Sequence, residues 1–144
     1  METTKTLKFN LLIAGLIVSS LGAWILIAPV EFHASYGTQL GDNPSLLSEI
    51  RAPGGALFAM GMFMLFGVFR RALAEPAALI AILTYLAYGG SRLFSLQQDG
   101  IPASGLLAAT GIELVIGIAC VWALMRDLRL QRAHTEPRTL GGVA

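Results

Sequence analysis

Two oppositely charged residues, Arg92 and Glu113, lie within stretches that otherwise hold almost no charge. A charge near the centre of a bilayer costs at least about 2.5–3.5 kcal/mol, so it normally faces a partner inside the protein. Glu113 has Thr110, Gly117 and Cys120 at helical spacing, while the flanking positions are large and apolar. This stripe predicts a carboxylate that points into a helix bundle, where it could exchange a proton.

The residues around Arg92 form a second polar stripe with the same helical period. Its members are Tyr85, Tyr88, Arg92, Ser95 and Asp99. A polar line on an otherwise apolar helix is typical of an interior or partner-facing edge. We therefore expect Arg92 to lie opposite Glu113, either as a structural ion pair or as part of a binding site for an anionic or carbonyl-bearing group.

A third polar group precedes another apolar segment, and it contains Glu49 and Arg51. Asn43 followed by Pro44 is a helix-start signal. The helix that begins there meets Pro53, which cannot donate a hydrogen bond to the carbonyl of Glu49. We expect either a kink or an interfacial turn followed by the membrane span.

Charge balance favours one buried network that joins Glu49 and Arg51 to Arg92 and Glu113. The predicted ligand-binding residues are Glu49, Arg51, Tyr88, Arg92, Ser95 and Glu113. The alternative is that Glu49 and Arg51 only reach interfacial water. His33 and Tyr36 either cap this site from outside or lie in a solvated loop.

Four apolar segments must position these residues. Hydrophobic residues make up 55% of the 144 residues and charged residues 13%, against about 25% charged in a soluble domain. A helix needs about 20 apolar residues to cross the hydrocarbon core. We predict an all-α, integral membrane four-helix bundle with spans at residues 7–29, 46–70, 76–98 and 102–126, and a basic tail at 127–144. The small edge Gly15, Ser19 and Gly22 should let the first span pack closely against a neighbour.

The basic residues predict the orientation of these spans. Lys5, Lys8, Arg70, Arg71 and the arginines after Met125 fall on one side, whereas Arg51 and Arg92 lie towards the other. The positive-inside rule then places both termini in the cytoplasm. A cleavable signal peptide over residues 1–30 is the alternative, but its apolar run exceeds the usual 7–15 residues.

The composition also excludes several function classes. A net charge of +1 disfavours a nucleic-acid partner. With one cysteine and two histidines, His33 and His134, in stretches predicted as non-helical, we expect no metal site and no cofactor. No nucleophile–base pair or phosphate loop indicates an enzyme.

The favoured function is a ligand- or lipid-binding protein, or an accessory subunit of a membrane complex, that binds a lipid or quinone-like molecule. Two other functions stay open. One is a dimeric proton-coupled transporter of small molecules that uses Glu113, and the other is a purely structural subunit of a homodimer or larger complex.

Three motifs carry a resemblance to a known family. They are Glu49-Ile50-Arg51-Ala52-Pro53-Gly54-Gly55, Gly89-Gly90-Ser91-Arg92 with Asp99-Gly100, and Glu113 in the fourth span. Over residues 7–125 the chain resembles small bacterial four-helix membrane proteins classed as a domain of unknown function. The resemblance implies the four-helix fold and a bacterial inner-membrane location, and it implies no activity. The layout is similar, more distantly, to DoxX-like membrane proteins, some of which are associated with quinone-linked oxidoreductases.

Overall fold

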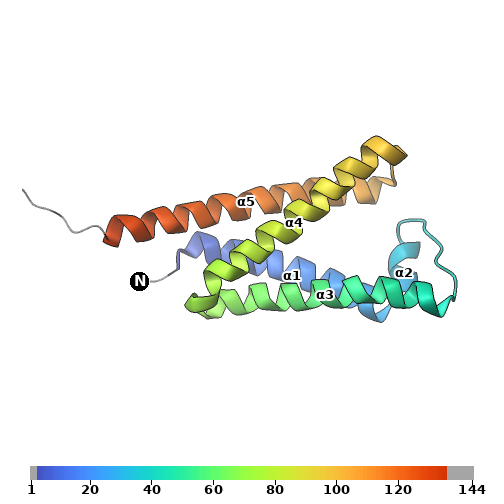
Figure 1. Ribbon diagram of the computed structural model, residues 1–144, viewed down its shortest axis with the longest axis horizontal. Coiled ribbons are helices and arrows are strands. Elements are labelled where there is room, and N and C mark those ends of the chain that lie inside the picture. Colours follow the sequence, from blue (N-terminus) through green and yellow to red (C-terminus); the bar gives the residue numbers. More distant parts are fainter. Residues whose placement is uncertain (1–2, 136–144) are drawn as a thin grey trace, which may run out of the picture.

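The computed structural model describes residues 3–135, which form five α-helices and no strand (Figure 1). Four helices are long: α1 (Lys5–Ile27), α3 (Pro44–Phe69), α4 (Arg71–Asp99) and α5 (Ser104–Thr135). The short α2 (Pro29–Ala34) follows α1. Each long helix is long and apolar enough to cross a membrane. The predicted all-α class with four spanning helices is therefore confirmed, and the chain is a small multi-pass membrane protein.

The helices differ from the expectations in three places. α3 is continuous through Pro53, which rules out the interfacial turn. α4 begins at Arg71, before Pro76. α5 continues to Thr135, so the first part of the expected tail is helical, while Pro137 and the rest of that tail lie outside the described residues.

The prediction that both histidines lie in non-helical stretches is wrong. His33 lies in α2 and His134 lies in the last turn of α5. α2 begins just after the end of α1 with Pro29 at its first position. A proline there fits because its fixed φ suits a helix start and the first N–H of a helix has no intrahelical partner. The segment after α1 is therefore partly helical, although it is too short to show a helical period.

α1 and α3 form a tightly packed antiparallel pair (Figure 1). A β-carbon added at Gly22 would overlap the backbone of α3, including the Gly54 carbonyl oxygen at 2.7 Å. A β-carbon at Gly61 would likewise meet the Cα of Ser19 at 2.8 Å. Small residues permit such close backbone approach between membrane helices. The predicted small edge of the first span is thus confirmed as the surface of α1 that contacts α3.

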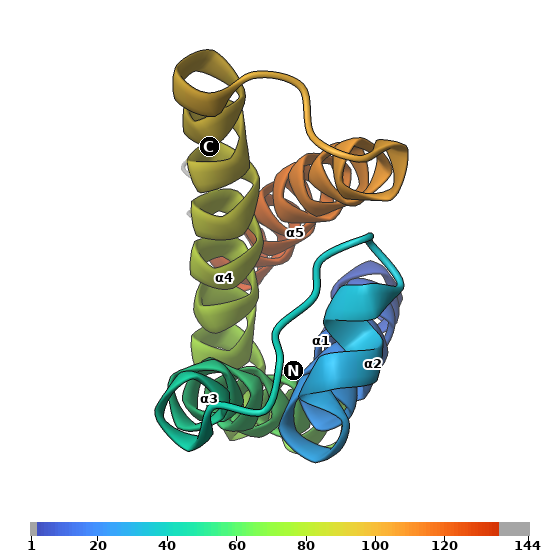
Figure 2. The same ribbon diagram turned by 90° about the vertical axis from the view of Figure 1, so that its right-hand side faces the viewer.

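α4 connects this pair to α5. It starts with one residue between it and the end of α3, and it leans across the molecule so that its middle part crosses α5 (Figures 1 and 2). Gly89 of α4 accommodates Leu114 of α5, and Gly117 of α5 accommodates Leu86 of α4. These two leucine–glycine contacts hold α4 and α5 in register around Glu113.

The two ends of the bundle differ. At the basic end, where α1 starts and α5 finishes, Asp127 accepts a hydrogen bond from the Thr4 amide at 2.7 Å, and Arg126 donates one to Thr6 at 3.2 Å. At the opposite end, called the open end here, α4 and α5 stand apart from α1, and the chain after α2 passes between them to α3 (Figure 2). The core that joins all four long helices therefore lies nearer the basic end, and it includes the fully buried Leu11 and Cys120.

Candidate functional site

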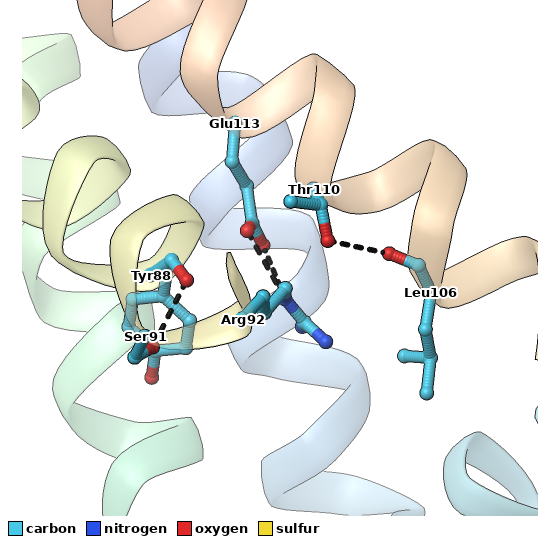
Figure 3. Close-up of polar contacts among 6 residues, drawn as sticks. All are labelled: Tyr88, Ser91, Arg92, Leu106, Thr110 and Glu113. Carbon is cyan, nitrogen blue, oxygen red and sulfur yellow. Dashed lines mark hydrogen bonds and ion pairs between the residues drawn. The ribbon is translucent and has the colours of Figure 1, made fainter. Parts of the chain in front are cut away.

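An ion pair joins α4 to α5 in the half of the molecule towards the open end. Nε of Arg92 donates to both carboxylate oxygens of Glu113, at 3.1 Å to Oε1 and 3.0 Å to Oε2 (Figure 3). The side chains are 32% and 14% exposed, respectively. The expected contact between these two residues is present in the structure. The polar stripe of α5 faces the interior as predicted, since Thr110, Gly117 and Cys120 are all buried. Glu113 belongs to that stripe and therefore points towards α4.

This ion pair uses only one of the three guanidinium nitrogens. Arginine has five N–H donors in a planar fork, and Nε supplies one of them. Within residues 3–135, neither Nη1 nor Nη2 of Arg92 has a hydrogen-bond partner. Figure 3 shows the far end of the guanidinium extending past the carboxylate. Glu113 therefore fixes the orientation of Arg92 and leaves its terminal donors available to another molecule.

Arg92 and Glu113 both line a cavity of about 760 Å³, within the range of roughly 300–1,000 Å³ typical of small-molecule sites. α1 and α5 contribute most of its wall, and α2, α3 and α4 complete it. Most lining side chains are apolar. The polar or titratable ones are Ser20, His33, Tyr36, Thr84, Tyr85, Tyr88, Arg92 and Glu113. The site is thus an apolar chamber with one ion pair and a few hydrogen-bonding groups.

Aromatic residues cover the cavity at the open end. Phe32 makes edge-to-face contacts with Trp24 and Tyr36, with ring centroids 5.3 and 5.4 Å apart. The Tyr36 ring lies against Gly105 at the start of α5, where a β-carbon would be 3.1 Å from Cε1. Tyr36 therefore bridges from the α2 side to α5. His33 and Tyr36 both line the cavity. This position supports the prediction that they cap the site, and it disfavours the alternative that they lie in a solvated loop.

The tyrosines of the α4 stripe have different surroundings. The Tyr85 hydroxyl donates to the carbonyl of Ala14 at 2.9 Å and is buried, so it ties α4 to α1. Tyr88 is half-buried and lines the cavity. Its hydroxyl forms no hydrogen bond with any part of the chain that the structure describes. Tyr88 is thus the member of the pair with a free hydroxyl at the site.

The structure does not bring the other predicted residues to this cavity. Nε of Arg51 donates to the Leu26 carbonyl at 3.2 Å near the end of α1, and Arg51 lines a separate, open pocket of about 590 Å³. Ser95 donates to Asp99 at 2.7 Å on the exposed last turns of α4. Glu49 is exposed and lines neither pocket.

The single four-charge network is therefore not formed. Its physical reason is the arrangement of the helices at the open end. The start of α3 remains against the end of α1, where Arg51 binds the Leu26 carbonyl. α4 leans away towards α5 and carries Arg92 with it (Figure 2). Residues at a similar depth in the membrane do not meet when the helices that carry them diverge laterally.

Two features escaped the sequence reasoning. Asp127 is 3% exposed and binds the start of α1, but it follows Arg126 directly and reads as part of a basic tail. The apolar cavity wall also has no sequence signal, since its residues resemble any lipid-facing stretch. Within residues 3–135 no group of three or more His, Cys, Asp or Glu side chains is placed to hold a metal ion.

A family model described as a domain of unknown function (DUF4345) matches residues 6–124. The chain belongs to the DUF4345 family. The DUF4345 match includes every residue that lines the cavity, from Leu16 to Glu113. No curated protein and no solved structure matches the chain. The more distant resemblance to DoxX-like proteins stays a prediction.

Proposed function

We propose that this protein binds an amphipathic, membrane-resident ligand in the cavity between α1, α4 and α5. Arg92 would hold an anionic or carbonyl oxygen of the ligand head, as in a lipid head group or a quinone, and the apolar walls would contact its body. One observation carries the proposal. Arg92 lines a cavity of about 760 Å³, and within residues 3–135 its Nη1 and Nη2 atoms form no hydrogen bond, because only Nε binds Glu113.

We place the protein in a bacterial inner membrane with both termini in the cytoplasm. Lys5, Arg70, Arg71 and Arg126 all lie at the basic end of the bundle. Cytoplasmic flanks of membrane helices carry the excess of lysine and arginine. The cavity would then lie in the periplasmic half of the bilayer, covered from the periplasm by α2 and Tyr36.

Two other functions compete with ligand binding. A dimeric proton-coupled transporter would use Glu113 as its proton carrier, but Arg92 already neutralises that carboxylate at 3.0 Å. A purely structural subunit needs the ion pair only for packing. That role does not account for a cavity beside the ion pair or for its free donors.

The test is native mass spectrometry of protein released from mild detergent, comparing wild type with Arg92→Gln/Glu113→Gln. The double substitution removes both charges together, so it leaves no unpaired ion in the bundle. Hydrogen bonds to a charged group contribute about 1.5–3 kcal/mol. We therefore expect retained amphiphile to fall roughly ten-fold or more.

Arg51→Gln is the matched control, because this arginine lies outside the cavity, and its retention should equal that of wild type. Equal retention in all three proteins would contradict ligand binding at Arg92. If the double variant instead loses a second polypeptide without any change in retained small molecules, the structural-subunit hypothesis would replace ours.

A further inference from the structure

The cavity reaches the surface of the bundle between α1 and α5. Five residues that line it are also exposed: Leu16 at 48%, Ile112 at 52%, and the small Ser20, Gly105 and Ala108. Leu16 and Ser20 belong to α1, and the other three belong to α5. These helices stand apart towards the open end (Figure 2). Both are membrane-spanning candidates, so this side opening faces the hydrocarbon region and not water.

The end of the cavity nearest the aqueous side is covered. Phe32, His33 and Tyr36 line it there, and the Tyr36 ring reaches across to Gly105 of α5. A ligand dissolved in the bilayer can reach the chamber through the side opening, whereas a solute in water meets the aromatic cover first. This geometry favours a ligand that partitions into lipid.

Charge restricts the ligand further. The opposite charges of Arg92 and Glu113 sum to zero. The other titratable groups that line the cavity are Tyr85 and Tyr88 on α4 and His33 and Tyr36 around α2, while α1 and α3 contribute none. An anion that entered alone would leave the cluster with a net negative charge, which a low-dielectric site disfavours. An anion that arrives with its own proton avoids this imbalance.

Resting on the proposed function and narrowing its ligand class, we infer that the ligand is a membrane-soluble weak acid, a carboxylic acid with an apolar chain. It enters between α1 and α5 in the neutral form. The O–H bond of its carboxyl group breaks and one forms on Glu113, so the ligand carboxylate and a neutral Glu113 share Arg92. The net charge of the site is zero before and after this transfer. The free Nη1 and Nη2 donors provide the two parallel hydrogen bonds that a carboxylate accepts from arginine.

The test uses palmitic acid as the probe and purified protein in phosphatidylcholine nanodiscs. An ordinary carboxyl group is ionised in water above about pH 5, so binding from water takes up one proton per ligand. Wild-type affinity should therefore fall about ten-fold for each unit that the pH rises between 6 and 8. Glu113→Gln already presents a neutral side chain, so it should bind palmitate at least as tightly at pH 8 and with no dependence on pH. Arg92→Gln should lose at least ten-fold in affinity.

Two controls sharpen this result. Hexadecan-1-ol has the same chain without an acid group, and its binding should not change with pH. The titration is repeated with His33→Gln, because His33 also lines the cavity and carries an ionisable imidazole. A pH dependence that survives in Glu113→Gln, or that disappears in His33→Gln, would overturn the transfer to Glu113.

The side route has its own measurement, the rate at which bound palmitate leaves for phosphatidylcholine vesicles. Ala108→Trp places a large side chain at the opening and should slow this exchange at least ten-fold. Leu83→Trp is the control, because Leu83 is 69% exposed on α4 and does not line the cavity. Equal rates in both variants would overturn entry between α1 and α5.

Failure of this inference differs from failure of the proposed function. If palmitate does not bind but retained amphiphile still depends on Arg92 and Glu113, the binding function stands and the weak-acid class is wrong. If hexadecan-1-ol and palmitate bind equally and neither responds to Arg92→Gln, both proposals fall.

Discussion

Single residues in this bundle show how charge is stabilised beside apolar helices. Arg92 and Glu113 neutralise each other next to a cavity. Asp127 is more deeply buried, and hydrogen bonds surround it: Oδ1 accepts from the Thr4 amide at 2.7 Å, and Oδ2 accepts from Gln131 at 2.6 Å. Thr4 is the N-cap of α1. The carboxylate thus sits at a helix start, where the backbone dipole favours negative charge.

We predict that Asp127→Ala destabilises the fold. The Thr4 amide would lose its acceptor while remaining partly buried, and leaving a buried donor unsatisfied costs about 1–3 kcal/mol. Thermal unfolding in detergent should show a lower midpoint than for wild type. Arg129→Ala is the control, since this exposed residue lies two positions along the same helix and should unfold with wild type. Equal midpoints for all three proteins would contradict a clamping role for Asp127.

Which site residues could be predicted from sequence depends on what positions each of them. The approach of Arg92 to Glu113 was predictable, because polar stripes identify the inward face of two helices connected by a short turn. The positions of Glu49 and Arg51 were not, since they depend on which neighbours α3 contacts at the open end. Arg51 binds a backbone carbonyl near the end of α1. The pattern of charged residues in a sequence does not indicate that an arginine will bind a backbone carbonyl.

At the scale of elements, the contact between α1 and α3 depends on glycines, which have no side chain to keep the two backbones apart. Gly22 and Gly54 let the two backbones approach, and Gly61 lies against Ser19. Membrane helices gain little from burying apolar surface against each other, because lipid is equally apolar. Close van der Waals contact along a row of small residues therefore stabilises the pair. The α1–α3 pair should therefore behave as one rigid unit.

We predict that Gly61→Ala destabilises this pair while Gly90→Ala does not. The new methyl group at position 61 would collide with the backbone of Ser19, and such overpacking costs about 1–3 kcal/mol. A β-carbon added at Gly90 would meet no neighbouring side chain or helix within 4 Å, so alanine there should be neutral or slightly stabilising. Unfolding in increasing concentrations of a denaturing detergent measures both. Equal loss in the two variants would mean that only helix flexibility, not contact, is affected.

The same elements show how far sequence reasoning extends. The four long helices were predictable because each apolar run has the length of a membrane span. The ends of these helices were harder to predict. Pro76 is typical of a helix start and Arg126 of the end of a span, yet α4 begins before Pro76 and α5 continues past Arg126. A proline within an early turn and a basic residue at a membrane boundary are both compatible with a continuing helix. α2 gives no period to detect.

Across the whole molecule, the two ends have different roles. At the basic end Asp127 accepts a hydrogen bond from the Thr4 amide and Arg126 donates one to Thr6, while further in the Tyr85 hydroxyl donates to the Ala14 carbonyl. The open end holds the cavity, with α4 and α5 diverging from α1 (Figure 2). A firmly closed end allows the other end to hold a chamber without loss of the fold. The side of the membrane that the open end faces therefore decides which leaflet the site serves.

We predict that the open end faces the periplasm, and single cysteines can test this. In a Cys120→Ala background, Ser45→Cys lies exposed at the start of α3 and Ala72→Cys lies exposed at the start of α4, at opposite ends. A membrane-impermeant maleimide should label Ser45→Cys in intact cells, and Ala72→Cys only after permeabilisation. The reason is the excess of arginine and lysine at the basic end, which resists translocation. The reverse labelling would direct the cavity to the cytoplasmic leaflet and would make that leaflet the source of its ligand.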